Sequence, residues 1–570
     1  MEILDWIVLS TTLFFIVIYG ALKTKGSANV KDYLLDNNET PWFTVGVSVM
    51  ATQASAITFL STPGQAYHDG MGFVQFYFGL PLAMIVIAYT FIPIYHRLKV
   101  YTAYEYLEQR FNIQTRTLAA ILFLIQRGLG TGITIYAPSI ILSALLGWNL
   151  NMLNIIIGIL VIVYTVTGGT KAVNVTQKQQ MFVIMGGMFI IFFYILANLP
   201  EEVDFSNVLH IAGANGKMDI LDFSYNPETR YTFWSGITGG FFLMLSYFGT
   251  DQSQVGRYLS GKSVKESQMG LIMNGLLKVP MQFFILLTGV LVFVFFQFND
   301  APLHFNPNNI EKVKTSEQKE AYENLEKKLT ELNTDKKIVN QIYIEQLKHN
   351  EYDNPILKKQ MVALSLKEKD LREKAKVVIS KVDEKTETND KDYVFLYFIL
   401  NYLPKGLLGL LLAVIFSAAM SSSASGLNSL GATSAIDIYK RNVNAKSDKH
   451  YVYATQYFTV FWGIVAIGFA CVSSLFENLI QLVNIIGSIF YGTVLGIFLI
   501  GFYINYVKGK AVFIGGLISQ TIVTFIFFKY IFFQTIESEK LGYLWLNLIG
   551  VVLTIGFSSL LEKIFNKSNT

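Results

Sequence analysis

The chain has 570 residues, of which 52% are hydrophobic and 15% charged, with a net charge of +4. Soluble domains carry about 25% charged residues, so this composition excludes a large soluble protein. A net charge this small gives no reason to expect a nucleic-acid partner. The one cysteine, Cys471, excludes a disulfide framework, and the six histidines are scattered without zinc-site spacing. We therefore predict a membrane protein whose partners are the lipid bilayer and a small-molecule solute, with no nucleic acid and no obligate protein partner.

Apolar stretches long enough to cross a bilayer recur along the whole chain. A spanning helix needs roughly 20 mostly apolar residues, and about 13 stretches meet that requirement. They lie at 4–22, 42–68, 72–95, 117–147, 149–167, 178–198, 232–250, 267–297, 394–436, 450–473, 477–505, 511–533 and 541–561. The first is not predicted to be a signal peptide, because Met1–Asp5 is acidic and no small-residue cleavage site follows. The expected fold is an all-α integral membrane protein.

Basic residues mark alternate connections between these stretches. They are Lys23 and Lys25; Arg97 and Lys99; Lys171 and Lys178; Arg257, Lys262 and Lys265; Lys440, Arg441 and Lys446; and Lys508 and Lys510. The connections between them are acidic or neutral, as at Glu201-Glu202. Short loops rich in Lys and Arg favour the cytoplasm. We therefore expect a multi-pass protein of the cell membrane, plasma or inner, with its N-terminus outside and its C-terminus cytoplasmic.

One polar insert interrupts the apolar chain. Residues 300–392 carry 37 of the 86 charged residues, 18 basic and 19 acidic. Apolar residues at helical spacing and the start signal Asn354-Pro355 predict a small helical appendage. Its mixed charges are typical of a solvated face, and with little apolar area it is expected to make few contacts across its boundaries. The predicted division is a membrane domain of 1–299 and 393–570, with an extracytoplasmic insert at 300–392.

The stretch 42–68 contains an unusually small and polar segment, Ala51–Phe59, and Pro63-Gly64 follow it. A spanning helix that is broken there can present backbone carbonyls to a cation. Non-helical backbone is tolerated at membrane depth only where protein or a cavity covers it. Close helix packing through small residues is the alternative explanation.

A second small and polar segment, Ala418–Ser425, lies in the stretch 394–436. Serines three or four residues apart share a helical face, and their hydroxyls are suitable ligands for a hard cation such as sodium. Alternatively, each hydroxyl bonds back to the carbonyl one turn earlier. Two such segments on different helices favour a shared ion site.

Two isolated charges, Arg127 and Lys278, lie far from the ends of their predicted spans. Arg127 is about ten residues into its helix, which places it about 15 Å deep in a core roughly 30 Å thick. Such charges face a cavity or a partner, or reach the interface when they are nearer a helix end. Because the neighbouring predicted helices offer few carboxylates, we expect the carboxylate of a solute to pair with Arg127.

Five segments of the chain together resemble one family of transporters. They are, in order, Pro41-Trp42, Ala51–Phe59, Tyr101–Asn112, Gly168–Val173 and Ser421–Lys440. Their sequence resembles that of the sodium:solute symporter family, which carries sugars, proline, sialic acid, monocarboxylates, vitamins and iodide. The resemblance implies two inverted five-helix repeats of the leucine-transporter type, at about 42–198 and 232–505, with the substrate at the broken first helix of each repeat.

The same resemblance implies a sodium site. Its ligands would be the backbone carbonyls of Ala51, Ala54 and Ala418 and the hydroxyls of Ser421 and Ser422. Some members bind a second sodium through an aspartate at the position that is Gln177 here, so one sodium is expected. Sodium is then the coupling ion, with no transition metal and no organic cofactor.

The expected solute is an organic anion. In sugar carriers four helices hydrogen-bond the sugar, but here two of the matching positions are the apolar Met244 and Val483. Other positions resemble the sialic-acid members and the monocarboxylate, vitamin and iodide branch. The implied substrate residues are Ser55, Thr58, Tyr77, Arg127, Tyr247 and Lys278. A monocarboxylate or sialic acid is therefore expected, with a neutral sugar as the alternative.

Two other classes of function compete with transport. A membrane sensor would carry a signalling domain after the last helix, and none is evident before Thr570. A membrane enzyme would need clustered His, Asp or Glu at depth, and the histidines are poorly placed for that. We therefore expect no enzyme but a secondary active symporter that imports its solute by alternating access.

Overall fold

The computed structural model describes residues 3–23, 29–349, 354–383, 386, 388–472, 479–532 and 541–567. Within these ranges the protein is almost entirely helical, and its β-structure is one isolated bridge between Thr40 and Gly261. The first half contains α1 (Ile3–Lys23), α2 (Val30–Leu35), α3 (Trp42–Gln53), α4 (Ala56–Asp69), η2 (Gly70–Tyr77), α5 (Leu80–Val86), η3 (Ile87–Phe91), α6 (Ile92–Leu98), α7 (Glu105–Arg110), α8 (Ile113–Leu146), α9 (Leu150–Ala197) and α10 (Phe205–Ala214).

The second half begins with α11 (Phe233–Ser235), η4 (Gly236–Gly240), α12 (Phe241–Thr250), α13 (Gln252–Leu259) and α14 (Val264–Phe298). The predicted insert contains α15 (Pro307–Lys314), α16 (Lys319–Lys348) and α17 (Pro355–Val382). The chain ends with α18 (Lys391–Tyr402), α19 (Leu407–Thr433), η5 (Ser434–Tyr439), α20 (Lys440–Asn442), α21 (Asp448–Ala470), α22 (Leu479–Tyr503), α23 (Gly509–Phe527), η7 (Phe528–Phe532) and α24 (Trp545–Lys567).

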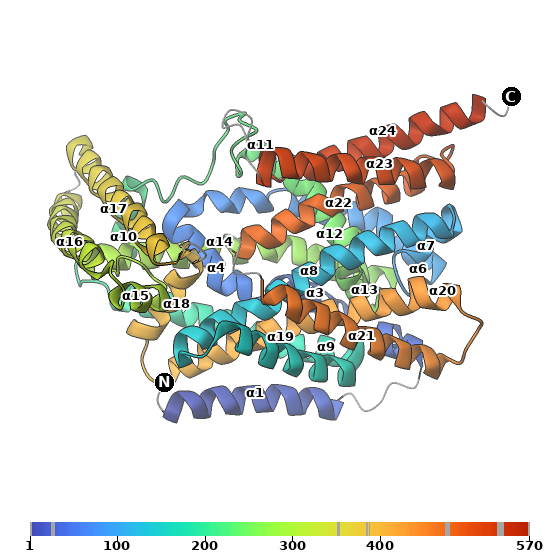
Figure 1. The fold of residues 1–570 in the computed structure, drawn as a ribbon, viewed down its shortest axis with the longest axis horizontal. Helices are drawn as coiled ribbons and strands as arrows, with labels where there is room; N and C mark the ends of the chain where they lie inside the picture. Colours follow the sequence, from blue (N-terminus) through green and yellow to red (C-terminus); the bar gives the residue numbers. More distant parts are fainter. Residues whose placement is uncertain are drawn as a thin grey trace.

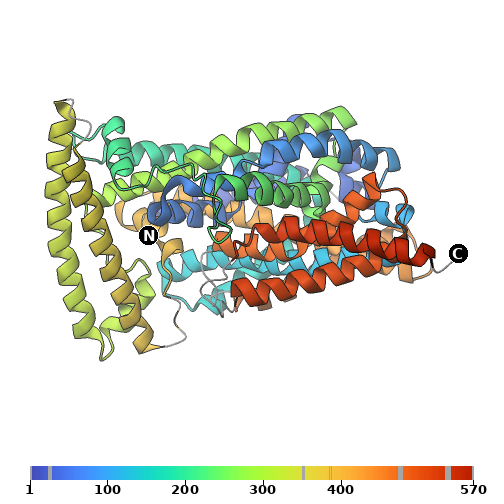
Figure 2. The same cartoon turned by 90° about the horizontal axis from the view of Figure 1, so that it is seen from above.

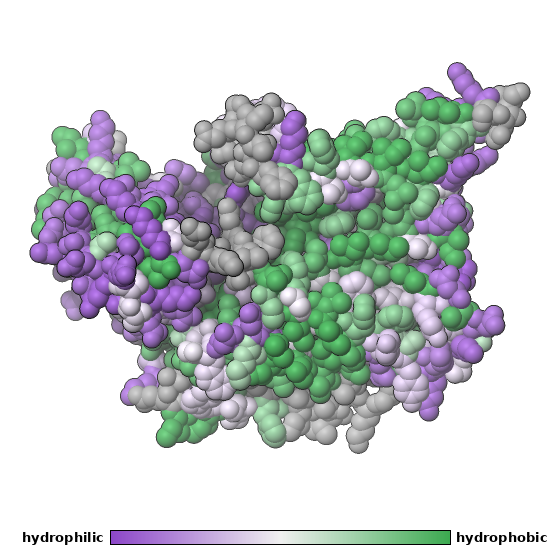
Figure 3. Space-filling view, in the orientation of Figure 1, coloured by the Kyte–Doolittle hydropathy of each residue, from purple (hydrophilic) through white to green (hydrophobic). Residues whose placement is uncertain are grey.

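The helices form a bundle whose long axis is horizontal in Figure 1. The hairpin of α16 and α17 stands across one end of the bundle, which we call the insert end (Figure 2). The C-terminus lies at the opposite end, which we call the far end. Figure 3 shows an apolar face over the bundle between the polar insert and a second polar rim at the far end. This is the surface expected of a protein whose bundle is surrounded by lipid.

Nine helices in the described ranges are long and apolar enough to cross a membrane. Of the other predicted spans, 42–68 is broken after α3, and 232–250 is divided among α11, η4 and α12. Helix α1 covers the whole of the predicted span 4–22. A break between Gln53 and Ala56 interrupts the first span of the first predicted repeat, and a break at Asp251 directly follows the first span of the second repeat. Both breaks lie among the most deeply buried residues of the bundle.

Helix α9 covers two predicted spans, 149–167 and 178–198. A straight helix of its 48 residues would be about 72 Å long, far more than a bilayer core of roughly 30 Å. Its first part runs along α21, where Asn154 donates to the Ala470 carbonyl and Gln456 to the Val166 carbonyl. Its second part runs along α19, with Gly187 against Leu411. Helices α19 and α21 follow one another and pack together, so the start of α19 and the end of α21 lie at the same end of the bundle. The first part of α9 begins beside the end of α21 and the second part reaches the start of α19, so the chain reverses direction within α9 and crosses the bundle twice.

The insert has a small core of its own, formed by Leu303, Val313, Tyr322, Leu329, Leu332, Ala375 and Ile379. The expectation that it makes few contacts with the bundle is wrong. Seven further insert residues belong to the main core: Ala301, Phe305, Tyr343, Ile344, Leu347, Leu357 and Met361. Tyr343, Ile344 and Leu347 lie on α16 at helical spacing and form an apolar stripe. The high average charge of the insert conceals this stripe in the sequence.

Candidate functional site

The break between α3 and α4 frees two backbone carbonyls. The amide of Ser55 donates to the Gln53 carbonyl rather than to Ala51, and the amide of Thr58 donates to Ser55 rather than to Ala54. The Ala51 and Ala54 carbonyls are therefore left out of the helical ladder, and both residues are buried. Backbone carbonyls released in this way are suitable ligands for a hard cation.

Helix α19 places the predicted serines against this break. The Ser422 hydroxyl donates to the Thr52 carbonyl at 3.4 Å. The Ser421 hydroxyl is buried and has no hydrogen-bond partner among the described residues. A buried hydroxyl without a partner is costly unless a ligand satisfies it, so the segment fits a sodium ion at this position. The structure thus brings together the two polar segments on which the sodium prediction rests.

Gln177 lies beside the same segments. Its side-chain amide donates to the Thr52 hydroxyl at 3.1 Å and to the Ser425 hydroxyl at 3.3 Å, and its oxygen accepts from Ser48. The amide is therefore committed as a donor between α3 and α19. A carboxylate at this position would offer only oxygen acceptors, which can bind a cation. The amide of Gln177 instead presents N–H groups where a second cation would need oxygen ligands.

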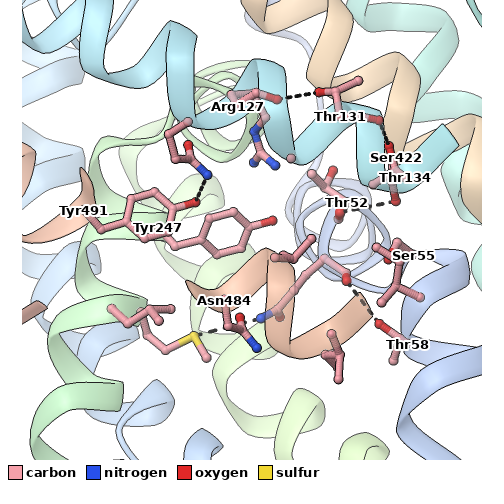
Figure 4. A pocket seen from close by; sticks show the side chains of 18 of the residues that line it. Thr52, Ser55, Thr58, Arg127, Thr131, Thr134, Tyr247, Ser422, Asn484 and Tyr491 are labelled. Carbon is pink, nitrogen blue, oxygen red and sulfur yellow. Dashed lines mark hydrogen bonds between the residues drawn. The ribbon is translucent and has the colours of Figure 1, made fainter. Parts of the chain in front are cut away.

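A buried cavity of about 90 Å³ lies next to the sodium segments (Figure 4). Of the six predicted substrate residues, it is lined by Ser55, Thr58, Tyr77, Arg127 and Tyr247. Ser422 also lines it, so a predicted sodium ligand is part of the cavity wall. Met244 and Val483 are in the wall as well, and neither can hydrogen-bond a sugar as a polar side chain would.

Arg127 points from α8 into this cavity, with Tyr247 and Tyr491 on one side and Thr52 near the α3–α4 break on the other (Figure 4). Its Nη2 lies 3.0 Å from Oδ2 of Asp251 and also donates to Ser253. Arg127 therefore already pairs with a carboxylate of the protein, a partner that the sequence did not lead us to expect. Its Nε is buried and has no hydrogen-bond partner in the described part of the chain, so this donor is available to a solute.

Asp251 is the main site residue that the sequence reasoning missed. It lies at the break between α12 and α13 with a fully buried side chain. Ser253 donates to its Oδ1 at 2.6 Å, and Tyr491 donates to its Oδ2 at 3.1 Å. The predicted span 232–250 ends one residue before Asp251. An acidic residue between two apolar helical segments was the available signal.

Lys278 is not among the residues that line the cavity. It is fully buried in α14, and its Nζ has no hydrogen-bond partner among the described residues. Gly270 packs against Val45 and Gly289 against Pro63, which places Lys278 level with the α3–α4 break. Its role in substrate binding remains a prediction.

Comparison with known proteins identifies the family. The model of the sodium:solute symporter family matches residues 33–332 and 374–519, and the chain belongs to that family. The unmatched gap lies inside the insert. The protein is accordingly a transporter of sodium-coupled type and not an enzyme, as the sequence predicts.

Several curated relatives are sodium-coupled carriers. The chain is 26% identical over 514 residues to sodium-coupled monocarboxylate transporter 1 of Xenopus laevis, covering 90% of this chain and 70% of that protein. It is 34% identical over 257 residues to the human protein of the same name, covering 45% and 42%. It is 31% identical over 259 residues to the human sodium/iodide cotransporter, covering 45% and 40%. The matches thus span less than half of each human relative.

A solved structure has the same fold. It is a Na+-coupled sialic acid symporter in a substrate-bound, outward-open state, with a TM-score of 0.73, 22% identity, and coverage of 99% of this chain and 98% of that one. This similarity confirms the predicted fold class, an all-α membrane protein of the leucine-transporter type.

Proposed function

We propose that this protein imports a small organic anion together with one sodium ion, and that the anion is a monocarboxylate. The observation that carries this proposal is Arg127 in the wall of a cavity that also includes Ser422, with its Nε lacking a hydrogen-bond partner among the described residues. Arginine binds carboxylates through directed, charge-assisted hydrogen bonds. The sodium ligands would be the carbonyls of Ala51, Ala54 and Ala418 with the hydroxyls of Ser421 and Ser422.

The charges at the site explain why the anion would need sodium. Arg127 and Asp251 neutralise each other, so an anionic solute adds one uncompensated negative charge beside a buried carboxylate. A sodium ion at Ser422 supplies the matching positive charge within the same cavity wall. Each ligand then favours binding of the other, which is the reciprocal coupling that symport requires.

The size of the cavity favours a small solute. Pockets that hold drug-sized ligands measure roughly 300–1,000 Å³, several times the 90 Å³ found here. A monocarboxylate is therefore preferred over sialic acid, and the apolar Met244 and Val483 in the wall disfavour a sugar. Monocarboxylate transporters among the curated relatives support the same choice.

The orientation belongs to this proposal. The basic connections predict a cell-membrane protein whose far end, with the C-terminus, is cytoplasmic. The insert end and the N-terminus would then lie outside. In this orientation the Arg127–Asp251 pair lies on the cytoplasmic side of the solute, and α4 leads from the cavity toward the insert.

Purified protein in proteoliposomes tests the proposed function. We expect an inward sodium gradient to drive uptake of radiolabelled lactate, with much weaker uptake of sialic acid and glucose. Replacing external sodium with potassium should abolish lactate uptake. Sodium-driven glucose uptake without lactate uptake would contradict the proposal.

A further inference from the structure

A second and larger cavity lies at the insert end of the bundle. Its volume is about 480 Å³, and it is lined by the end of α4, the loop after α10, Phe293 of α14, helix α17 and the start of α18. It is separate from the transport cavity, because Ser55 and Thr58 line that cavity near one end of α4 whereas His68 and Asp69 line this one at the other. About ten residues of helix separate the two groups, a distance of about 15 Å.

Each carboxylate in the wall of this cavity already has a partner. Glu368 bonds Lys336 and Arg372, at 2.6 and 2.9 Å. Asp69 bonds Lys391 at 2.7 Å, and Glu373 bonds Lys376 at 2.8 Å. Asp390 accepts from the Phe305 amide at 2.8 Å and lies 3.9 Å from His68.

The cationic groups are not matched in the same way. Lys217 donates to the His68 carbonyl at 2.5 Å and lies over the Phe293 ring, but forms no ion pair with a described residue. Lys369 also lines the cavity and forms no ion pair within the described ranges. Arg372 uses Nε for Glu368 and Nη1 for the Leu303 carbonyl. Its Nη2 is buried without a hydrogen-bond partner, and the side chain is only 9% exposed.

We propose that this cavity, which we call the outer site, binds a small organic carboxylate, held by Lys217, Lys369 and Arg372. The cations provide charge-assisted hydrogen bonds to the carboxylate. Phe293 and Leu366 in the wall cover its apolar part. Burial lowers the pKa of Lys217 to about 8, and a bound anion would stabilise its charged form. The site goes beyond the proposed transport function and needs no sodium.

A chain of polar contacts connects this cavity with the transport cavity. Lys391 bonds Asp69, which accepts from Gln65 at 2.5 Å. Gln65 in turn accepts from Gln481 at 3.2 Å, and Gln481 is adjacent to Ile480, which lines the transport cavity. The contacts of the outer site therefore extend to the start of α22, beside a residue that lines the transport cavity.

Equilibrium binding of radiolabelled lactate to purified full-length protein in sodium-free potassium buffer tests the proposal. The Ser421→Ala, Ser422→Ala double variant is the background, so that the proposed transport site is disabled. We expect one lactate per protein, and a loss of affinity of about tenfold or more when Lys217→Gln and Lys369→Gln are added. Lys374→Gln is the matched control, because Lys374 lies on α17 together with Lys369, is 60% exposed and pairs with Asp370.

Two further variants distinguish lost binding from misfolding. Lys369→Gln alone changes an exposed side chain and should still weaken binding, and Lys217→Arg should retain it. Lactamide should not bind the outer site. Lactate binding that requires sodium, or that is unchanged by Lys217→Gln with Lys369→Gln, would overturn the outer site and leave the transport proposal standing.

Discussion

Arg127 of α8 and Asp251 at the α12–α13 break form an ion pair of 3.0 Å beside the transport cavity. Each comes from a different predicted repeat, so the pair joins the two halves of the bundle at the site. Tyr491 and Ser253 hold the carboxylate, and Tyr247 lies beside the guanidinium, 5.5 Å from ring centroid to Cζ. The arginine is thereby fixed, while its Nε has no hydrogen-bond partner among the described residues.

Asp251→Asn should leave Arg127 without a compensating charge. Removing one partner of a buried pair costs about 3–5 kcal/mol, so we expect a lower melting temperature without solute. Lactate should then raise the melting temperature of this variant more than that of the wild type, because the solute replaces the lost carboxylate. Thermal melting in detergent with lactate, and with uncharged lactamide as the control, measures this. Equal stabilisation by lactate and lactamide would contradict the role of charge.

Arg127→Lys keeps the charge but loses the planar fork, and Arg127→Gln loses both. Lactate uptake should therefore fall in the first variant and fall further in the second. Sodium affinity measured without solute should stay unchanged, since the proposed sodium ligands are on α3 and α19. If lactate and lactamide were affected equally, Arg127 would have only a structural role.

Ser421→Ala with Ser422→Ala should weaken sodium binding. Each lost hydroxyl ligand costs about 1–3 kcal/mol, or roughly 5- to 150-fold in affinity. Ser429→Ala is the matched control, since Ser429 is buried on the same helix and bonds back to the Gly426 carbonyl at 2.8 Å. Sodium-dependent melting and uptake should change only in the double variant. A wild-type sodium affinity there would remove these serines from the site.

The acidic and basic residues at the far end should give the protein a pH-dependent stability. Arg116 bonds Glu108 and Asp437, both at 2.7 Å, and Arg441 bonds Glu108 as well. Burial, together with the nearby charge of Asp437, raises the pKa of Glu105 in this cluster to about 7. A raised pKa contributes stability that is present at low pH and is lost as pH rises through that value.

We therefore expect wild-type protein to lose melting temperature between about pH 5 and pH 8. Glu105→Gln should lose less over the same range, because its side chain cannot ionise. Glu311→Gln is a suitable control, as it changes an exposed acid in the insert. Identical pH profiles for wild type and Glu105→Gln would exclude this residue as the cause.

The sequence predicted the parts of the fold and site that depend on composition. Small polar residues are conspicuous in apolar spans, which is why Ala51–Phe59 and the α19 serines could be found. The Arg127–Asp251 pair could not, because contacts between helices depend on packing that a sequence pattern does not specify. The apolar stripe around Tyr343 was missed because it was averaged with the many charges of the insert.

Simultaneous flux of sodium and solute tests the central claim most directly. Proteoliposomes would receive radioactive sodium and radiolabelled lactate together, with both initial rates measured in the same vesicles. Gln177 holds donors where a second cation would need oxygen, so we predict one sodium per lactate and a sodium Hill slope near one. The coupled movement is then electroneutral, and a tenfold sodium gradient supports about tenfold accumulation. Sodium entry that lactate does not stimulate, or two sodium ions per lactate with strong voltage dependence, would contradict the account.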